Sequence, residues 1–191
     1  MLVWGFGLCL FLFLLSAEYS AVICGAWPGT YSDLTVALSH SDILLCSETL
    51  VSEFRYESCV GVTGSRIVPG QDDCAGARDM AAYVWDGYAA FRQPKFDCGC
   101  CEMLVFRLCG VRQNLYVFSL YRNPDLDDQI FFDCLLASMA AVKTEDIRAS
   151  LGIIRSGHHQ EWLGSTTTNR HGVGAFDFAT ISGCDQLVVG P

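Results

Sequence analysis

The stretch CEMLVFRLCGVRQNLYVFSLYRNPDL, residues 101–126, decides the fold prediction. It contains two apolar runs of strand length, Met103–Cys109 and Leu115–Tyr121, and the glycine-containing connection between them suits a hairpin. Three aspartates between residues 125 and 128 crowd the next segment, where the positive end of a helix dipole favours negative charge. The stretch therefore predicts an antiparallel hairpin that is followed by a helix.

The chain beyond this stretch continues to alternate between helix and strand. The predicted helix runs to about residue 142 and gathers apolar residues on one face, namely Ile130, Cys134, Leu135, Met139 and Val142. After it we expect a strand at Leu151–Ile154, a short helix at Val173–Ile181 that stops at Gly183, and a last strand at Leu187–Val189. This alternation indicates an α/β fold.

The chain before residue 101 adds two strands and a long connection. We expect a strand at Ile43–Ser47 and another around Ala81–Val84, with a turn at Asp86–Gly87. Residues 55–78 are rich in glycine and polar residues and lack a clear hydrophobic period, which predicts a loop. Together with the hairpin, these strands favour an α/β domain with at least one antiparallel pair.

Composition limits the class of protein. The chain has 191 residues, of which 51% are hydrophobic, which is enough for one domain with a real core. Its formal net charge of −9 argues against broad, unassisted binding to phosphate backbones. The same charge is compatible with a site in which carboxylates hold a divalent metal that in turn meets a phosphate.

The first 40 residues form an apolar leader that differs in style from the rest. Residues 1–27 contain no lysine or arginine, their first charge is Glu18, and the apolar run Leu2–Ala17 is short for a transmembrane span. A secretory signal, a membrane anchor and a translated non-coding leader all remain open. We therefore divide the chain into a leader, residues 1–40, and a domain, residues 41–191. A membrane partner, or secretion, is expected only if the leader acts as an anchor or a signal.

The eleven cysteines do not form an evident disulfide framework. Their number is odd, and several lie in apolar runs, as Cys46 and Cys109 do, where cysteine behaves as a small buried hydrophobe. The dense cluster at residues 98–101 is compatible with a zinc site, but no second ligand pair with zinc spacing is at hand. The cysteine content and the leader together keep open a secreted cysteine-rich binding protein.

Polar groups follow three of the expected strands. They are Glu48, the Tyr-Arg-Asn-Pro segment at residues 121–124, and the pair His158 and His159. Each has an ordinary structural interpretation: a solvated glutamate, a turn that uses the fixed φ of proline, and a surface histidine pair. Their order along the chain is what favours a functional site, because α/β proteins place their chemistry at strand ends.

This order resembles the endonuclease/exonuclease/phosphatase superfamily, and in particular the apurinic-endonuclease-like domain of non-LTR retrotransposon polyproteins. Four segments between Ser41 and Pro191 carry the resemblance: ILLCSETLVS at 43–52, NLYVFSLYRNP at 114–124, HHQEWLGSTTTNRHG at 158–172 and AFDFATISGCDQLVVGP at 175–191. In the third segment, Trp162, Gly164, Asn169 and Gly172 stand where the family pattern has them.

The resemblance implies a fold and a reaction. The family fold is an α/β two-sheet sandwich flanked by helices, and its reaction is Mg²⁺-dependent hydrolysis of a phosphodiester in DNA. By match to the family motifs, Glu48 is the metal ligand, Tyr121 contacts the phosphate, and Asn123 is its partner. The resemblance also implies an intracellular or nuclear location and predicts that Glu48 and Tyr121 lie on one rim of the sandwich.

The sequence departs from the family where the catalytic base should be. The family's Gly-Asp-x-Asn signature should precede Gly157, but the chain reads GIIRS at 152–156, which puts Arg155 in place of an acid. The family also continues past the point matched by Pro191 to a metal-site aspartate and a Ser-Asp-His triplet. We therefore expect a copy truncated at its C-terminus: a degenerate Mg²⁺-dependent endonuclease by descent or, alternatively, a non-catalytic relic. His158 and His159 adjoin this turn but do not match the family's catalytic histidine.

Overall fold

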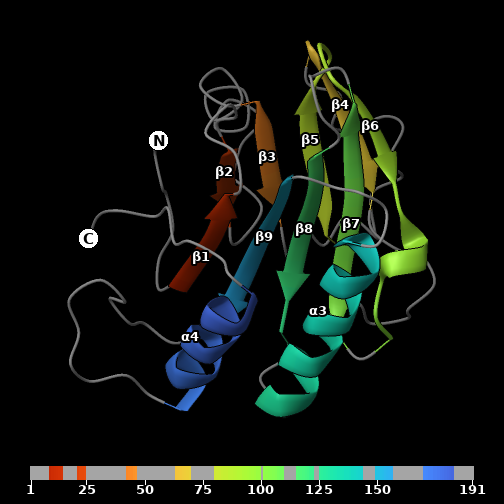
Figure 1. The fold of residues 1–191 in the computed structure, drawn as a ribbon. Helices are drawn as coiled ribbons and strands as arrows, with labels where there is room; N and C mark the ends of the chain where they lie inside the picture. Colours follow the sequence, from red (N-terminus) through yellow and green to blue (C-terminus); the bar gives the residue numbers. More distant parts are fainter. Residues whose placement is uncertain are drawn as a thin grey trace.

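The computed structural model describes residues 9–14, 21–24, 42–46, 63–69, 80–99, 101–109, 115–122, 125–143, 149–156 and 170–182. They form a sandwich of a five-stranded and a four-stranded sheet, with both described α-helices on the outer face of the larger sheet (Figure 1). The strand orders are β1-β9-β8-β7-β6 and β2-β3-β5-β4. The predicted α/β two-sheet sandwich with flanking helices is therefore confirmed.

The predicted hairpin forms the middle of the larger sheet. It consists of β7 (Glu102–Cys109) and β8 (Leu115–Tyr121), which pair antiparallel from Leu108 opposite Leu115 to Glu102 opposite Tyr121. On its other side β8 pairs parallel with β9 (Ala149–Ser156), which contains the strand predicted at 151–154. The edge strand β6 (Ala89–Arg92) pairs with β7 and was not predicted.

Strand β8 is buried at all seven positions because both of its faces are covered. Its odd-numbered residues face the smaller sheet and its even-numbered residues face the helices, as the period of two in a strand requires. The inner core lies between the sheets and consists of Ile43, Leu45, Val68, Met80, Ala82, Val84, Leu104, Phe106, Leu108, Leu115, Val117 and Tyr121. The outer core lies under the helices and consists of Phe96, Met103, Val105, Tyr116, Phe118, Leu120, Phe131, Phe132, Leu135, Met139, Val142 and Phe178.

Helix α3 (Asp128–Lys143) lies where the sequence predicts a helix, but one residue of its predicted apolar face is wrong. Ile130 is 51% exposed, whereas Phe131 is fully buried. The aromatic rings decide the orientation of the helix: Phe132 stacks on Phe178 of α4 (Arg170–Ser182), with ring centroids 5.6 Å apart. Helix α4 contains the helix predicted at 173–181, while Gly183 and the strand predicted at 187–189 lie outside the described residues.

The smaller sheet contains a strand that the sequence analysis assigns to a loop. Strands β3 (Ile43–Cys46) and β5 (Ala81–Trp85) lie at the predicted places and pair antiparallel. The edge strand β4 (Ser65–Pro69) pairs with β5. It lies within residues 55–78, so the prediction that this whole segment is a loop is wrong. The hydrophobic pattern of β4 is weak because it is the edge strand of the sheet that the structure describes and only its Val68 is buried, and Pro69 is tolerated at such an edge.

Two strands come from the segment that the sequence analysis treats as a leader. Strand β1 (Cys9–Leu14) pairs antiparallel with β9, and β2 (Ala21–Cys24) pairs parallel with β3, so each extends one of the two sheets. The domain boundary at residue 40 and the role of the leader stay predictions. Among the described residues, no helix has the length and apolar character that crossing a membrane requires.

Candidate functional site

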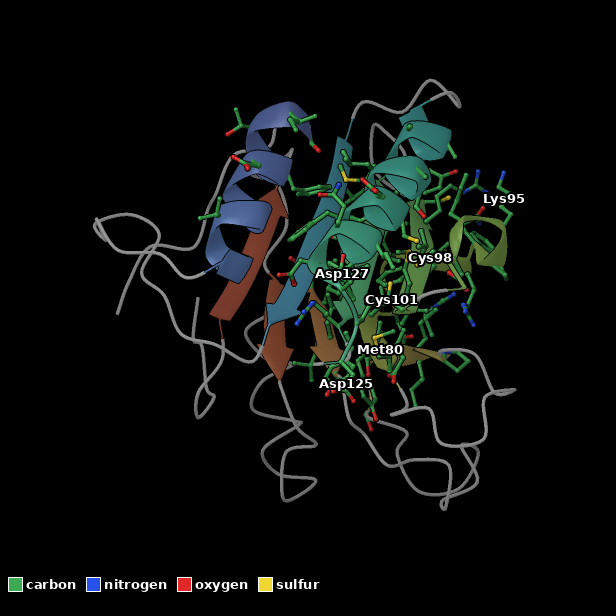
Figure 2. The ribbon with its side chains drawn as sticks, turned by 90° about the horizontal axis from the view of Figure 1, so that it is seen from below. Met80, Lys95, Cys98, Cys101, Asp125 and Asp127 are labelled. Atoms are coloured by element: carbon green, nitrogen blue, oxygen red, sulfur yellow. The ribbon has the colours of Figure 1, made fainter. Side chains whose placement is uncertain are left out.

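The candidate site lies at the rim where β8 and β9 end. These two strands are parallel, and the arrow of β3 points the same way as theirs (Figure 1). Figure 2 looks onto this rim from below. Of the residues predicted for the site, Tyr121 is the last residue of β8, while Glu48 and Asn123 lie outside the described residues. The histidine pair at 158 and 159, to which the sequence analysis assigns no role, lies outside them as well. The predicted proximity of Glu48 and Tyr121 therefore stays a prediction.

The pairing of three neighbouring strands places chemically useful residues in one row at this rim. Tyr121 is the Cα partner of Glu102 on β7 and of Arg155 on β9. We call Glu102, Tyr121 and Arg155 the rim row. It combines a carboxylic acid, a phenol and a guanidinium from three strands.

Tyr121 is held firmly in this row. Its side chain is only 6% exposed and belongs to the inner core between the two sheets. On the same face of β8, the hydroxyl of Ser119 is 4.0 Å from the sulfur of Met80, which directly precedes β5. Because the surrounding core fixes its ring, Tyr121 presents little freedom of orientation at the rim.

Glu102 is the member of the rim row that sequence analysis missed. It is the first residue of β7, its side chain is half-buried, and its Oε2 atom is enclosed by the protein. The hairpin carried the signal that could have found it. Once Leu108 is paired with Leu115, counting back along both strands places Glu102 opposite Tyr121.

A buried ion pair between Arg122 and Asp128 stabilises the connection between β8 and α3. Nη2 of Arg122 lies 2.7 Å from Oδ1 of Asp128 and donates a hydrogen bond of 2.7 Å to the carbonyl of Leu126. Both charged residues are more than nine-tenths buried. The guanidinium of Arg122 therefore ties the end of β8 to the first turn of α3.

Asp127 caps the N-terminus of α3. Its Oδ1 accepts hydrogen bonds from the backbone N–H groups of Gln129 at 2.9 Å and of Ile130 at 3.4 Å, which is the geometry of an N-cap. Asp125 and Asp127 are both exposed, and Figure 2 shows both on the side from which the rim is viewed. The sequence analysis assigns these aspartates to the start of the helix, and the cap gives Asp127 that role.

The described residues do not by themselves form a metal centre. Nowhere among them do three or more histidine, cysteine, aspartate or glutamate side chains converge in a way that could hold a metal ion. The one expected Mg²⁺ ligand, Glu48, lies outside this part of the chain.

Comparison with known proteins bears on the fold. No family model matches the chain, and no curated protein sequence matches it. Among solved structures, the chain is similar to the endonuclease domain of TRAS1, a telomere-specific non-LTR retrotransposon, with a TM-score of 0.60 and 14% sequence identity. The similarity covers 86% of this chain and 70% of that chain. The chain therefore shares an endonuclease-like fold with that domain.

Proposed function

We propose that this chain is an endonuclease-fold domain of the endonuclease/exonuclease/phosphatase type that binds DNA at the rim row and cleaves it poorly or not at all. The observation that carries the proposal is the similarity of its two-sheet sandwich to a retrotransposon endonuclease domain. The sequence resemblance over residues 41–191 supports the same assignment.

The proposed roles follow the resemblance and the rim geometry. Tyr121 would contact a DNA phosphate, with Asn123 beside it in sequence. The inner core supports this role of Tyr121 because it fixes the ring, so little side-chain entropy is lost when the phosphate binds. Glu48 would hold Mg²⁺, which in this family supplies positive charge to the phosphate and the leaving oxygen.

The loss of cleavage rests on Arg155. In the family this turn carries the acid that activates the attacking water, and here it reads Arg155-Ser156. The strand register sets Arg155 beside Tyr121 in the rim row, so the substitution falls within the proposed site. General acid–base catalysis typically contributes about 10²–10⁴-fold to a rate, and a guanidinium cannot serve as the base at neutral pH.

The negative charge of the chain opposes the binding of DNA. The net charge is −9, Asp125 and Asp127 are exposed near the rim, and the guanidinium of Arg122 is already engaged by Asp128. A phosphate backbone would be repelled unless cations intervene, so we expect binding to duplex DNA to strengthen with millimolar Mg²⁺.

Fluorescence anisotropy of a labelled DNA duplex tests the proposal, with Tyr121→Phe as the variant. Loss of one hydrogen bond to a charged phosphate should cost about 1.5 kcal/mol, or about tenfold in Kd. Tyr116→Phe is the matched control, because Tyr116 is equally buried on β8 but faces the helices. Equal losses in both variants, or no DNA binding by the wild-type chain with Mg²⁺, would contradict the proposal, and the second result would favour the non-catalytic relic.

One observation favours a second candidate, a secreted cysteine-rich binding protein. Cys134 on α3 is disulfide-bonded, as in proteins of oxidising compartments, although Cys46, Cys98, Cys101 and Cys109 carry thiols. Expression in a secreting cell separates the candidates. Export with removal of the leader would support the second candidate, and retention of the full chain inside the cell would support the first.

A further inference from the structure

Two cysteines meet outside the rim row, at the turn that leads into β7. The turn follows the short 3₁₀-helix η2 (Pro94–Phe96), and in it the sulfur of Cys98 lies 3.0 Å from the sulfur of Cys101. Both residues carry thiols and are half-buried. Figure 2 labels them on the side of the molecule where Lys95 marks η2. The pair has the C-x-x-C spacing that brings two sulfurs together in a single turn.

The turn is anchored on the N-terminal side of Cys98. The backbone N–H of Asp97 donates a hydrogen bond of 3.0 Å to the carbonyl of Pro94, and the carboxylate of Asp97 pairs with Arg92. Phe96 is buried in the outer core, where its ring packs edge-on against Tyr116 with centroids 5.7 Å apart. The fold therefore fixes the segment that leads directly into Cys98.

The surroundings of the two sulfurs give them different roles. The hydrogen bond with Cys98, burial, and the neighbouring Glu102 and Asp97 all raise the pKa of the Cys101 thiol above its usual range. Cys101 therefore keeps its proton and can donate it toward the sulfur of Cys98. In thiol–disulfide exchange the attacking group is a thiolate, which makes Cys98 the sulfur that reacts first.

We propose that Cys98 and Cys101 form a reversible dithiol–disulfide site that exchanges with small-molecule disulfides of the glutathione class. The Cys98 thiolate attacks one sulfur of the small disulfide, a mixed disulfide forms, and one small thiolate leaves. Once Cys98 is in the mixed disulfide, its hydrogen bond with Cys101 is lost, so the first small thiolate can take the proton of Cys101. The Cys101 sulfur then attacks the Cys98 sulfur and releases the second small thiolate, which takes back from water the proton that Cys98 gave up when it became a thiolate. The products are the Cys98–Cys101 disulfide and two small thiols, so the protein loses two electrons and two protons, and the small disulfide gains them.

Zinc binding would require more ligands at this place than a disulfide does. Structural zinc takes four ligands, and the described residues bring no third histidine, cysteine, aspartate or glutamate into a common site with the two sulfurs. Asp97, the acid that directly precedes Cys98, is paired with Arg92. Two thiols alone suffice for a disulfide.

Differential alkylation with mass spectrometry tests the site. The full-length chain is reduced, freed of reductant, exposed to glutathione disulfide, and alkylated before trypsin digestion. The tryptic peptide Phe96–Arg107 contains Cys98, Cys100 and Cys101. We expect this peptide to lack two hydrogen atoms, with the alkyl label on Cys100 only. Dithiothreitol should restore the reactivity of the other two cysteines.

Three variants locate the bond. Cys100→Ser should form the disulfide as the wild-type chain does, whereas Cys98→Ser and Cys101→Ser should form at least about tenfold less, because the second exchange step is intramolecular only for the correct pair. Labelling of the wild-type peptide decides the matter even if a variant fails to fold. A wild-type peptide that is alkylated at all three cysteines, or a bond that involves Cys100, would overturn the proposal.

Discussion

The two faces of the five-stranded sheet differ in what they pack against and in what they carry at the rim. The inner face meets the other sheet through mainly aliphatic residues and ends in Glu102 and Tyr121. The outer face meets the helices through mainly aromatic residues and ends in the Cys98–Cys101 pair and the Arg122–Asp128 ion pair. The inner face carries the proposed DNA-binding residues. The outer face carries the ion pair that stabilises the start of α3 and the cysteine pair of the proposed disulfide site.

The division depends on the alternation of side chains along β8. Tyr121 and Arg122 are neighbours in sequence, yet Tyr121 packs in the inner core while Arg122 pairs with the helix on the outer side. A shift of one residue in register would exchange the two faces. Burial of all seven residues of β8 makes such a shift costly, so the core fixes which side chains reach the proposed site.

The largest effect on stability is expected in the outer core, between the larger sheet and the helices. Phe131→Ala should lower the free energy of unfolding by about 3–5 kcal/mol, because it removes a fully buried ring from the outer core. Ile130→Ala, one residue earlier on the same helix, should change it by less than about 0.5 kcal/mol, because Ile130 is exposed. Urea denaturation of both variants gives the comparison. Similar losses from the two substitutions would show that α3 is turned differently on the sheet.

A smaller effect is expected at the ion pair behind the rim. Arg122→Met should cost about 3 kcal/mol of stability, because it leaves the carboxylate of Asp128 buried without its cation. The double variant Arg122→Met/Asp128→Asn should lose clearly less than the sum of the two single variants. Denaturant unfolding of all four proteins measures this coupling. Strictly additive losses would mean that the pair does not act as a unit.

The smallest effect in this series is expected at the helix cap. Asp127→Ala should cost about 1 kcal/mol, because two backbone N–H groups lose their acceptor. Asp125→Ala, two residues earlier and also exposed, should stay within about 0.5 kcal/mol of the wild-type protein. Thermal unfolding followed by circular dichroism distinguishes the two. A larger loss from Asp125→Ala would reassign the cap.

Sequence reasoning succeeded where burial is complete. Leu115–Tyr121 was predicted with its correct bounds because a strand that is covered on both faces reads as a continuous apolar run. It failed at β4 and β6, which are edge strands whose few buried residues leave little pattern. It also misplaced Ile130, because helical spacing alone does not tell which of two adjacent apolar residues the aromatic core will accept.

The candidate site was predictable only in part, because strand pairing and not a motif sets the position of some of its residues. Motif resemblance selected Tyr121, which the structure places at the strand end, but it did not select Glu102, whose position follows from hairpin pairing and not from any motif. The Cys98–Cys101 contact also depends on local geometry. The sequence shows the spacing, and the structure adds that Arg92 and Phe96 anchor the segment that leads into Cys98.

Nicking of supercoiled plasmid DNA with Mg²⁺ tests the central claim most directly, namely that the endonuclease-like fold is retained and efficient cleavage is lost. Purified wild-type chain is compared with its Glu48→Ala variant over a range of Mg²⁺ concentrations. If Arg155-Ser156 stands where the family has its general base, as we propose, neither protein should nick the plasmid above the rate of a protein-free control. Robust Mg²⁺-dependent nicking by the wild-type chain that Glu48→Ala abolishes would contradict the account.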